Sequence, residues 1–527
     1  IAIGYNALDA GVDGVQNCIG IGSAALGALT ASGGTTGTGP SIGIGYNALA
    51  GATSGINNIA IGGWCLDAVV TGNQNIGIGN NALTVLTSAA NNIAIGQNSG
   101  DAITSSPGNT LVGNNAGSAI STGSGENVCI GNNAGASMTT GAQNIIIGDN
   151  AVGGAALTGT VNVVIGDNAG YAMTGASNGN TLVGGAAGDA ITTGDNNTAV
   201  GAYALTDEDE SSAITAIGYN AGNNHNGGTA NTFVGAYCGD AVTTGTANTY
   251  IGDSCAGIAN TGSGNCGFGH NALSTLTTGA NNVAIGYEAG YGTGGTFDSS
   301  GGVFIGYRAG KAITSGATNV CIGADAGTAL TSGGSNVCIG HQACDGGTTV
   351  SNSIFIGAAT EQSSDGEYQI VIGNSIASPG NNVVAFGKAS NVIQNTFTSN
   401  ATWSQASDER LKTDIKDNTL GLDFINEMET KTYRWKPSYD VPQELTNHYN
   451  EENQKDTDVL MYGMMAQKVK ESMDKYDNPE FTGWEENKDG SQNVSREMFV
   501  IPLIKAVQEL SAQVNELKNE VKTLKGK

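Results

Sequence analysis

The stretch "NIAIGQNSGDAITSSPG", residues 92–108, contains the unit from which most of the chain is built. An Asn stands four positions before the central glycine, and apolar residues fill the positions between them. A small residue follows three positions after the glycine, and an apolar residue with Thr behind it follows after seven. The unit recurs from Gly4 to Gly373, mostly in steps of 17 or 18 residues, and makes 22 coils, the first one incomplete. Such a period predicts stacked structural repeats.

Each coil has a short β-branched run bounded by Gly and Asn, which is typical of a strand between tight turns. In-register stacking predicts a mainly β fold, with a parallel β-solenoid or β-roll shaft over residues 1–387. At a strand spacing near 4.8 Å the coils would form a rod on the order of 100 Å long. The recurring Asn positions would stack as an amide ladder at a corner. They include Asn127, Asn144, Asn162, Asn319 and Asn336.

The two residues before each glycine are both apolar, as in Ala94 with Ile95 and Cys129 with Ile130. Neighbouring strand residues point to opposite faces, so an isolated solenoid would carry a polar residue at one of the two positions. The second face therefore needs a cover. Other copies of the same chain around a shared axis are the simplest one.

Charge divides the sequence into two parts. Residues 1–399 hold 78 of the 83 glycines, 22 acids and three cations, whereas the last 128 residues hold 24 acids and 17 cations. The two parts have net charges of -19 and -7, which account for the total of -26. So acidic a surface repels phosphate, and we expect no nucleic-acid partner.

The ends and the apolar runs indicate a chain without a membrane span. No run approaches the roughly 20 residues of a membrane helix, and no signal peptide opens the sequence. The sequence begins in the middle of a repeat without an initiator Met. We therefore expect an amino-terminal part, with an attachment or targeting element, to be missing.

Several features of the shaft invite a binding function, but a simpler interpretation is favoured for each. The nine cysteines stand singly, which favours buried free thiols over disulfides or metal ligands. The Thr column could match an ice or sugar lattice, although bonding to nearby backbone groups is the stronger interpretation. The acidic run 207–210 could hold a cation, but a solvated loop is favoured.

Metal, cofactor and substrate sites are not indicated in the shaft. His225, His270 and His341 have no partners at ligand spacing, so we expect no metal and no cofactor. Glu288 and Arg308 occupy corresponding positions in consecutive coils and could form a surface pair worth little. No pair of acids suited to glycoside hydrolysis stands out.

From about Ser407 the sequence has the character of a small α+β domain. We expect a helix around 420–428, a strand at 432–435, a strand ending at Tyr462 followed by a helix, and a long helix over about 496–525. Apolar residues in this last helix alternate in steps of four and three, which predicts a coiled coil, and core choice alone leans toward a dimer. These seam residues are Leu503, Val507, Leu510, Val514, Leu517, Val521 and Leu524.

The shaft repeats resemble the head repeats of trimeric autotransporter adhesins, whose units build left-handed β-rolls in a trimer. They are equally similar to repeats of tailed-phage fibre shafts. The resemblance implies a homotrimer. We favour the trimer over the dimer because a helix tethered to a large trimer assembles with the same stoichiometry.

The last part of the chain carries a more specific resemblance. "SDERLKTDI" (407–415), "TYRW" (432–435), "YGMMAQKV" (462–469) and "MFVIPLIKAVQEL" (498–510) are together similar to the intramolecular chaperone domain of endosialidase-type phage tail proteins. The resemblance implies that residues 407–527, after a connecting segment 388–406, trimerise, guide folding of the preceding β-rich shaft and then cut themselves off.

The same resemblance implies the residues of a cleavage site. The scissile bond joins Ala406 to Ser407, Ser407 is the nucleophile, Lys412 is its base, and Asp408 supports the site. A serine hydroxyl needs such a base, and a lysine can serve if burial or a nearby cation such as Arg410 lowers its pKa. The alternative is that Ser407 only caps a helix with an acid in its first turn.

The sequence thus predicts a trimeric phage tail fibre in the virion, which recognises a host surface and contains a single-turnover serine autopeptidase. Its expected partners are its own copies, a host glycan or outer-membrane receptor, and a tail or baseplate protein bound through the missing amino-terminal part. A bacterial surface adhesin with the same chaperone, and a tailspike that binds or depolymerises capsule, are the alternatives.

Overall fold

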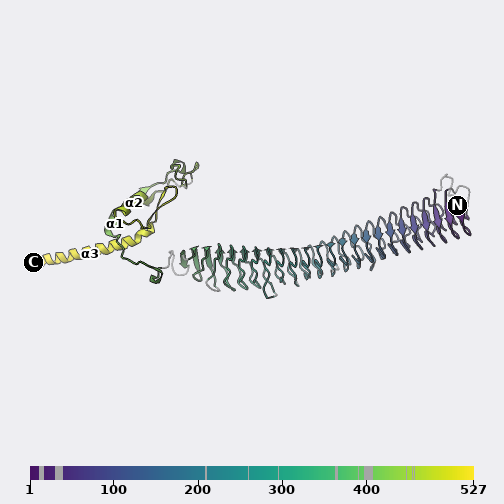
Figure 1. Cartoon of the computed structure of the whole chain (residues 1–527), viewed down its shortest axis with the longest axis horizontal. Coiled ribbons are helices and arrows are strands. Elements are labelled where there is room, and N and C mark those ends of the chain that lie inside the picture. Colours follow the sequence, from purple (N-terminus) through teal and green to yellow (C-terminus); the bar gives the residue numbers. More distant parts are fainter. Residues whose placement is uncertain are drawn as a thin grey trace. The chain divides into compact units, whose positions relative to one another are not determined.

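The computed structural model describes residues 1–10, 17–29, 39–207, 210–258, 260–294, 296–362, 366–389, 391–396, 407–446, 448–453, 455 and 457–526. The chain divides into two compact units, residues 1–405 and 406–527, and each is described by itself. Figure 1 shows the first unit as a row of stacked coils. Among the described residues, none of the helices combines the length and apolar content that a membrane span needs.

The first unit is built on one sheet that receives one strand from each coil, which confirms the predicted β-solenoid. Neighbouring coils pair in parallel and in register, as Val128 pairs with Ile145 and Ile145 with Val163. The last strand, β24, folds back antiparallel onto β23, so the sheet extends beyond residue 387. The strands are β1 (Ala2–Ile3), β2 (Ile19–Ile21), β3 (Ile42–Ile44), β4 (Ile59–Ile61), β5 (Ile76–Ile78), β6 (Ile93–Ile95), β7 (Thr110–Val112), β8 (Val128–Ile130), β9 (Ile145–Ile147), β10 (Val163–Ile165), β11 (Thr181–Val183), β12 (Thr198–Val200), β13 (Thr215–Ile217), β14 (Thr232–Val234), β15 (Thr249–Ile251), β16 (Cys266–Phe268), β17 (Val283–Ile285), β18 (Val303–Ile305), β19 (Val320–Ile322), β20 (Val337–Ile339), β21 (Ile354–Ile356), β22 (Gln369–Asn374), β23 (Val383–Lys388) and β24 (Asn391–Thr396).

The motif glycine is required by both its conformation and its surroundings. Gly96 has φ +139°, outside the range that L side chains adopt readily, and a Cβ there would overlap the carbonyl oxygen of Gly113 in the next coil. Because Gly113 meets Gly131 in the same way, the glycines form a column in which the coils approach most closely. The column explains the strict recurrence of glycine in the sequence.

The interior of each coil is filled from two directions. The middle residue of every strand from β2 to β21 is buried, and so is the apolar residue seven positions after the glycine, such as Ile103. Small side chains such as Ala94 occupy one part of the interior. Large rings occupy another part, where Phe233 and Tyr250 stack with their centroids 6.1 Å apart. The core is therefore one continuous apolar column along the first unit.

The polar columns agree with the sequence. The buried asparagines form the predicted ladder, in which the amide oxygen of one coil accepts hydrogen bonds from the backbone and amide nitrogens of the next, as between Asn127 and Asn144 at 3.0 and 3.2 Å. The Thr hydroxyls donate to backbone carbonyls of the following coil, as Thr104 does to Ser121 at 3.0 Å. This confirms the turn interpretation of the Thr column. All nine cysteines are free, as predicted, and eight of them are buried.

The histidines and acidic loop occupy turns. His225 is buried, and its Nε2 lies 2.9 Å from the amide nitrogen of Asn231. His270 stacks on the ring of Tyr287. The described residues contain no group of three or more His, Cys, Asp and Glu side chains placed to hold a metal ion. Of the acidic run 207–210, residues 208 and 209 lie outside the described residues.

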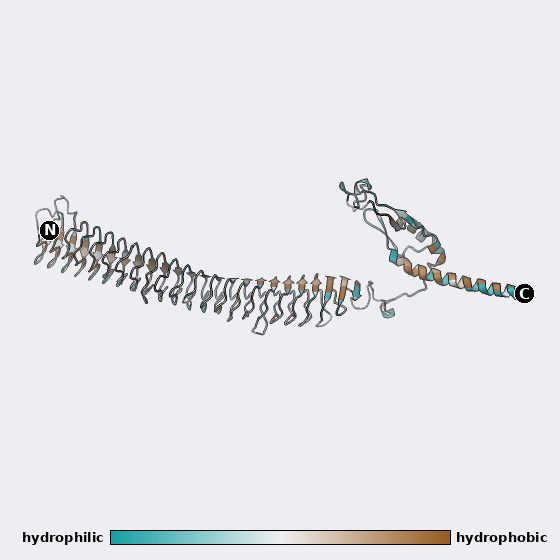
Figure 2. Ribbon diagram, turned by 180° about the vertical axis from the view of Figure 1, so that it is seen from behind, coloured by the Kyte–Doolittle hydropathy of each residue, from teal (hydrophilic) through white to brown (hydrophobic). Residues whose placement is uncertain are grey.

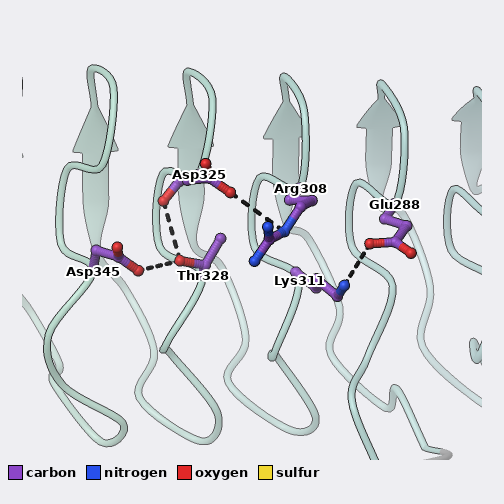
Figure 3. A network of polar contacts seen from close by, with 6 residues as sticks. All are labelled: Glu288, Arg308, Lys311, Asp325, Thr328 and Asp345. Atoms are coloured by element: carbon purple, nitrogen blue, oxygen red, sulfur yellow. Dashed lines mark hydrogen bonds and ion pairs between the residues drawn. The ribbon is translucent and has the colours of Figure 1, made fainter.

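The expected pair between Glu288 and Arg308 is wrong. Lys311 supplies the cation for Glu288 at 2.5 Å, and Arg308 lies 3.4 Å from Asp325 in the following coil (Figure 3). Both cations belong to one coil, but their side chains extend in opposite directions along the shaft axis (Figure 3). Corresponding positions were therefore the wrong guide to partners.

One apolar face of the sheet points outward. The third residue of every strand from β2 to β21 is Ile, Val or Phe, and none is fully buried in the single chain. Ile95 and Ile285, for example, are 37% and 41% exposed. Figure 2 shows the resulting brown strands along the shaft. The sequence prediction of two apolar faces per strand is confirmed, since one faces the core and the other faces outward.

The second unit is a small α+β fold. Its apolar cluster joins Leu420, Phe424, Val469, Met473 and Phe499. The helix expected around 420–428 and the helix after Tyr462 are both present, the first shorter than expected. The elements are η1 (Glu409–Leu411), α1 (Leu422–Asn426), β25 (Lys431–Tyr433), η2 (Ser438–Asp440), β26 (Met461–Gly463), α2 (Ala466–Lys475), β27 (Trp484–Glu486), β28 (Gln492–Val494), η3 (Arg496–Phe499) and α3 (Val500–Lys525).

Candidate functional site

The first described residues of the second unit bring Ser407 and Lys412 together. The Lys412 ammonium nitrogen donates to the Ser407 hydroxyl oxygen over 2.7 Å. A single 3₁₀ turn, η1, lies between them and folds the lysine back, because the amides of Leu411 and Lys412 donate to the carbonyls of Asp408 and Glu409. The nucleophile and base implied by the resemblance are thus in direct contact.

Asp408 holds the turn and its arginine. Its Oδ1 accepts from the Arg410 amide at 2.9 Å and so caps η1. The Arg410 guanidinium also donates to both carboxylate oxygens, Nε to Oδ1 at 3.0 Å and Nη2 to Oδ2 at 2.6 Å. This guanidinium, together with the Arg410 amide, holds the pKa of Asp408 below its ordinary value, and Asp408 in turn raises the pKa of Arg410.

These contacts assign roles that differ in part from those expected. The cap of the turn is Asp408, and Ser407 stands one position before it, so the alternative that Ser407 serves only as a helix cap is wrong. Asp408 bonds to Arg410 rather than to the serine or the lysine. The positive charge of Arg410 is therefore paired with the Asp408 carboxylate. Ala406, the other residue of the expected scissile bond, lies outside the described residues.

The pair of Ser407 and Lys412 is open to water in the single chain. Every residue from 407 to 417 is exposed. A lysine serves as the base for a serine only in its neutral form, and removal from water is what favours that form. The arrangement therefore has the contact that catalysis needs and lacks the burial that would activate the base.

The long helix α3 presents the predicted apolar seam. It runs without a break from Val500 to Lys525, while the expected start at 496–499 is the 3₁₀ turn η3. All seven seam residues are exposed in the single chain, from 41% at Val514 to 73% at Leu524. Leu503 also lines a hollow of about 950 Å³ together with Ile425 and Phe499.

The comparisons with known proteins agree with this location. Residues 407–477 match a peptidase family described as the chaperone of endosialidase. No curated protein and no solved structure matches the chain. The match begins at Ser407, the residue that Lys412 contacts, and covers η1 through α2. The second unit therefore contains a segment similar to the chaperone of endosialidase, and in the sequence this segment follows the β-solenoid shaft.

Proposed function

We propose that this chain forms the shaft of a homotrimeric phage tail fibre, whose C-terminal domain gathers three copies, guides folding of the shaft and then cuts the bond between Ala406 and Ser407. The 2.7 Å contact between Lys412 and Ser407, at the first residue of the family match, carries the proposal. The fibre would attach to a host-surface receptor and join the virion through a tail protein.

The outward apolar face supports association of copies. Soluble monomers rarely expose a continuous apolar patch beyond a few hundred Å². Here every coil adds an Ile, Val or Phe to the same outward column. Covering the exposed part of one Ile contributes about 0.5–1 kcal/mol, since full burial is worth about 1.5–3 kcal/mol. Because some twenty coils each add such a residue, the summed contribution strongly favours association of copies of the chain.

The cleavage step can be written from this chain alone. Neutral Lys412 accepts the hydroxyl proton of Ser407, and the serine oxygen attacks the carbonyl carbon of residue 406. The bond between that carbon and the Ser407 nitrogen breaks as the nitrogen takes a proton, which leaves an ester. Water then hydrolyses the ester, so that one peptide bond and one water give one carboxylate and one amine.

Assembly supplies the condition that the single chain lacks. Packing of a second copy against residues 407–412 would remove water from Lys412 and favour its neutral form. Cleavage would then follow trimer formation rather than precede it. This order suits a β-solenoid, because non-local pairing is slow and exposes strand edges until the coils are in register. Loss of the chaperone domain afterwards would leave the shaft kinetically trapped.

The test is denaturing electrophoresis of the freshly expressed chain beside Ser407→Ala, Lys412→Ala and Lys412→Arg. We expect the wild type to release fragment 407–527 and all three variants to remain intact, because arginine keeps the charge but cannot take up the proton. Lys416→Ala, an exposed lysine of the same segment, is the matched control and should be cut. An intact wild-type chain in a trimer of confirmed mass would refute the cleavage.

A further inference from the structure

One surface ladder of the shaft stops where another begins. On the turn after the strand, amide side chains stack coil on coil from Asn81 through Asn98, Asn115 and Asn133 to Asn150, with bonds of 2.9–3.1 Å. At the last rung, the Asn150 side-chain amide donates instead to the carboxylate of the preceding residue, Asp149. The column therefore ends there as an amide ladder.

An aromatic ladder occupies the same turn three coils further on. The rings of Tyr203, Tyr219 and Tyr237 follow one another edge to face, with centroids 6.0 and 5.4 Å apart. Between the two ladders the coil of β11 carries Gly185 and Ala186, which have almost no side chain. Neither ladder therefore passes through the coil of β11.

The surface is hollowed at the coil of β11. A surface cavity of about 330 Å³ opens over Gly185 and Ala186 and is walled by Asp167, Asp189, Tyr171 and Tyr203. Both tyrosines are about half exposed, at 46% and 48%. Ligand pockets for small molecules begin at about 300 Å³ and combine ring faces with a few polar groups. The size and the wall composition fit one sugar ring.

One wall residue lacks a partner. The Oδ1 atom of Asp189 is buried and accepts no hydrogen bond from any described residue. Burial and, secondarily, the charge of Asp207 raise the pKa of Asp189. Asp240, at the equivalent position of its own coil, leaves the same oxygen without a partner, so this feature belongs to the turn. Asp167 and Asp189 both line the hollow, and those of their carboxylate oxygens that face it can accept hydrogen bonds from ligand hydroxyls.

We propose that this hollow binds one neutral or N-acetylated pyranose unit of a surface glycan, with its hydroxyls donating to Asp167 and Asp189 and its apolar face against a tyrosine ring. The walls carry two carboxylates, and the nearest cations along the sequence, Arg308 and Lys311, lie more than a hundred residues further on. Acidic sugars are therefore excluded by charge. The site rests on the proposed attachment function and specifies its ligand.

A matched pair of variants tests the hollow. Ala186 has φ +52°, and Tyr203 and Tyr237 hold the same turn position with φ +58° and +53°, so Ala186→Tyr fills the hollow without a new backbone demand. Ala186→Asn is the second variant, because asparagines occupy that position in the amide ladder. Ala24→Tyr is the control, since Ala24 holds the same turn position at φ +59° far from the hollow along the chain.

Saturation-transfer difference NMR of the full chain would use three neutral probes, the methyl glycosides of glucose, galactose and N-acetylglucosamine, and one acidic probe, the methyl glycoside of N-acetylneuraminic acid. We expect at least one neutral probe to bind wild type and Ala24→Tyr, with Kd on the order of 1 mM. Both Ala186 variants should weaken this binding at least tenfold. Binding should persist in EDTA.

Four results would overturn the site: no signal from any neutral probe, equal signals in the Ala186 variants, a preference for the acidic probe, or loss of binding in EDTA, which would indicate a cation site instead. Light scattering and electrophoresis of the same samples separate this outcome from failure of the proposed function. If the trimer forms and fragment 407–527 is released while the sugars fail, only the site is wrong.

Discussion

Removal of one rung from the buried amide ladder should destabilise the shaft locally. The Asn144 side chain donates to the Asn127 amide oxygen at 3.2 Å and to the Gly159 carbonyl at 3.0 Å. Its own oxygen accepts from the backbone and amide nitrogens of Asn162 at 2.9 and 3.0 Å. Asn144 itself is fully buried. Asn144→Ala deletes these four bonds, and a weaker one to the Met138 sulfur, in a place that water does not reach.

The cost follows from the groups left without partners. The Asn127 amide oxygen still accepts a hydrogen bond from the backbone amide of residue 144, and the Asn162 side chain still donates one to the Ser177 carbonyl. The Gly159 carbonyl and the Asn162 backbone N–H lose the one side-chain partner that the described residues give each of them. A buried group left unsatisfied costs about 1–3 kcal/mol, so we expect a loss of about 2–6 kcal/mol. At 1.36 kcal/mol per tenfold change, the lower bound is about a 30-fold effect.

Hydrogen exchange measured by mass spectrometry can locate this loss. Because each coil contacts only its neighbours, the Asn162 amide and its surrounding coils should exchange at least about 30-fold faster, while the amide of Val283 in a distant coil should not change. Asn133→Ala removes a rung of the half-buried surface ladder and should have less than about a tenfold effect, because water can replace bonds at the surface. A change below threefold at Asn162, or one spread evenly over the shaft, would refute the reasoning.

Three further predictions concern buried groups of the shaft. Burial raises the pKa of Asp240 to about 6, so ionisation of this carboxylate lowers the stability of the folded shaft above that pH. Asp240→Asn should therefore raise Tm at about pH 7.5 and leave it unchanged near pH 4. Burial also raises the pKa of Cys65 and Cys129 to about 12, so neither should react with iodoacetamide at about pH 8 until guanidinium unfolds the chain. Lys311→Met leaves the Glu288 carboxylate, whose side chain is only 16% exposed, without its cation, and should lower the free energy of unfolding by about 1–2 kcal/mol in a denaturant titration. Adding Glu288→Gln to the same chain should largely restore that free energy.

The fold could be predicted from the sequence because the repeat encodes it many times over. Glycine is forced at positions such as Gly96 by the approach of the next coil, and Asn144 is forced by the ladder, so both recur at fixed intervals. A strand of three residues, such as β6, would carry little signal alone. Repetition makes the pattern unambiguous, and the unpaired apolar face follows from the same pattern.

Side-chain partners were harder to predict where the repeat does not constrain them. Glu288 and Arg308 occupy equivalent positions, yet Lys311, three residues further on, has the reach and direction to meet the glutamate. The contact between Ser407 and Lys412 spans five residues, a spacing that neither a helix nor a strand brings together. It depends on a short turn that Asp408 caps, whereas the sequence suggested a capping role for Ser407.

A shaft of near-identical coils creates a problem of register that its repeats cannot solve. Sliding one copy along another by a whole coil leaves the outward Ile and Val column facing an equivalent column, so the apolar face gives strength of association but little choice of register. The residues that distinguish coils are few. The charged group around Arg308 and Lys311 is one such set, and its bonds lie within a single chain. The proposed chaperone would meet this need, because register fixed at one end of the shaft passes to every later coil through in-register stacking. A domain that sets register is most useful at one end of the repeats, and the segment similar to the chaperone of endosialidase follows the last strands of the solenoid in the sequence.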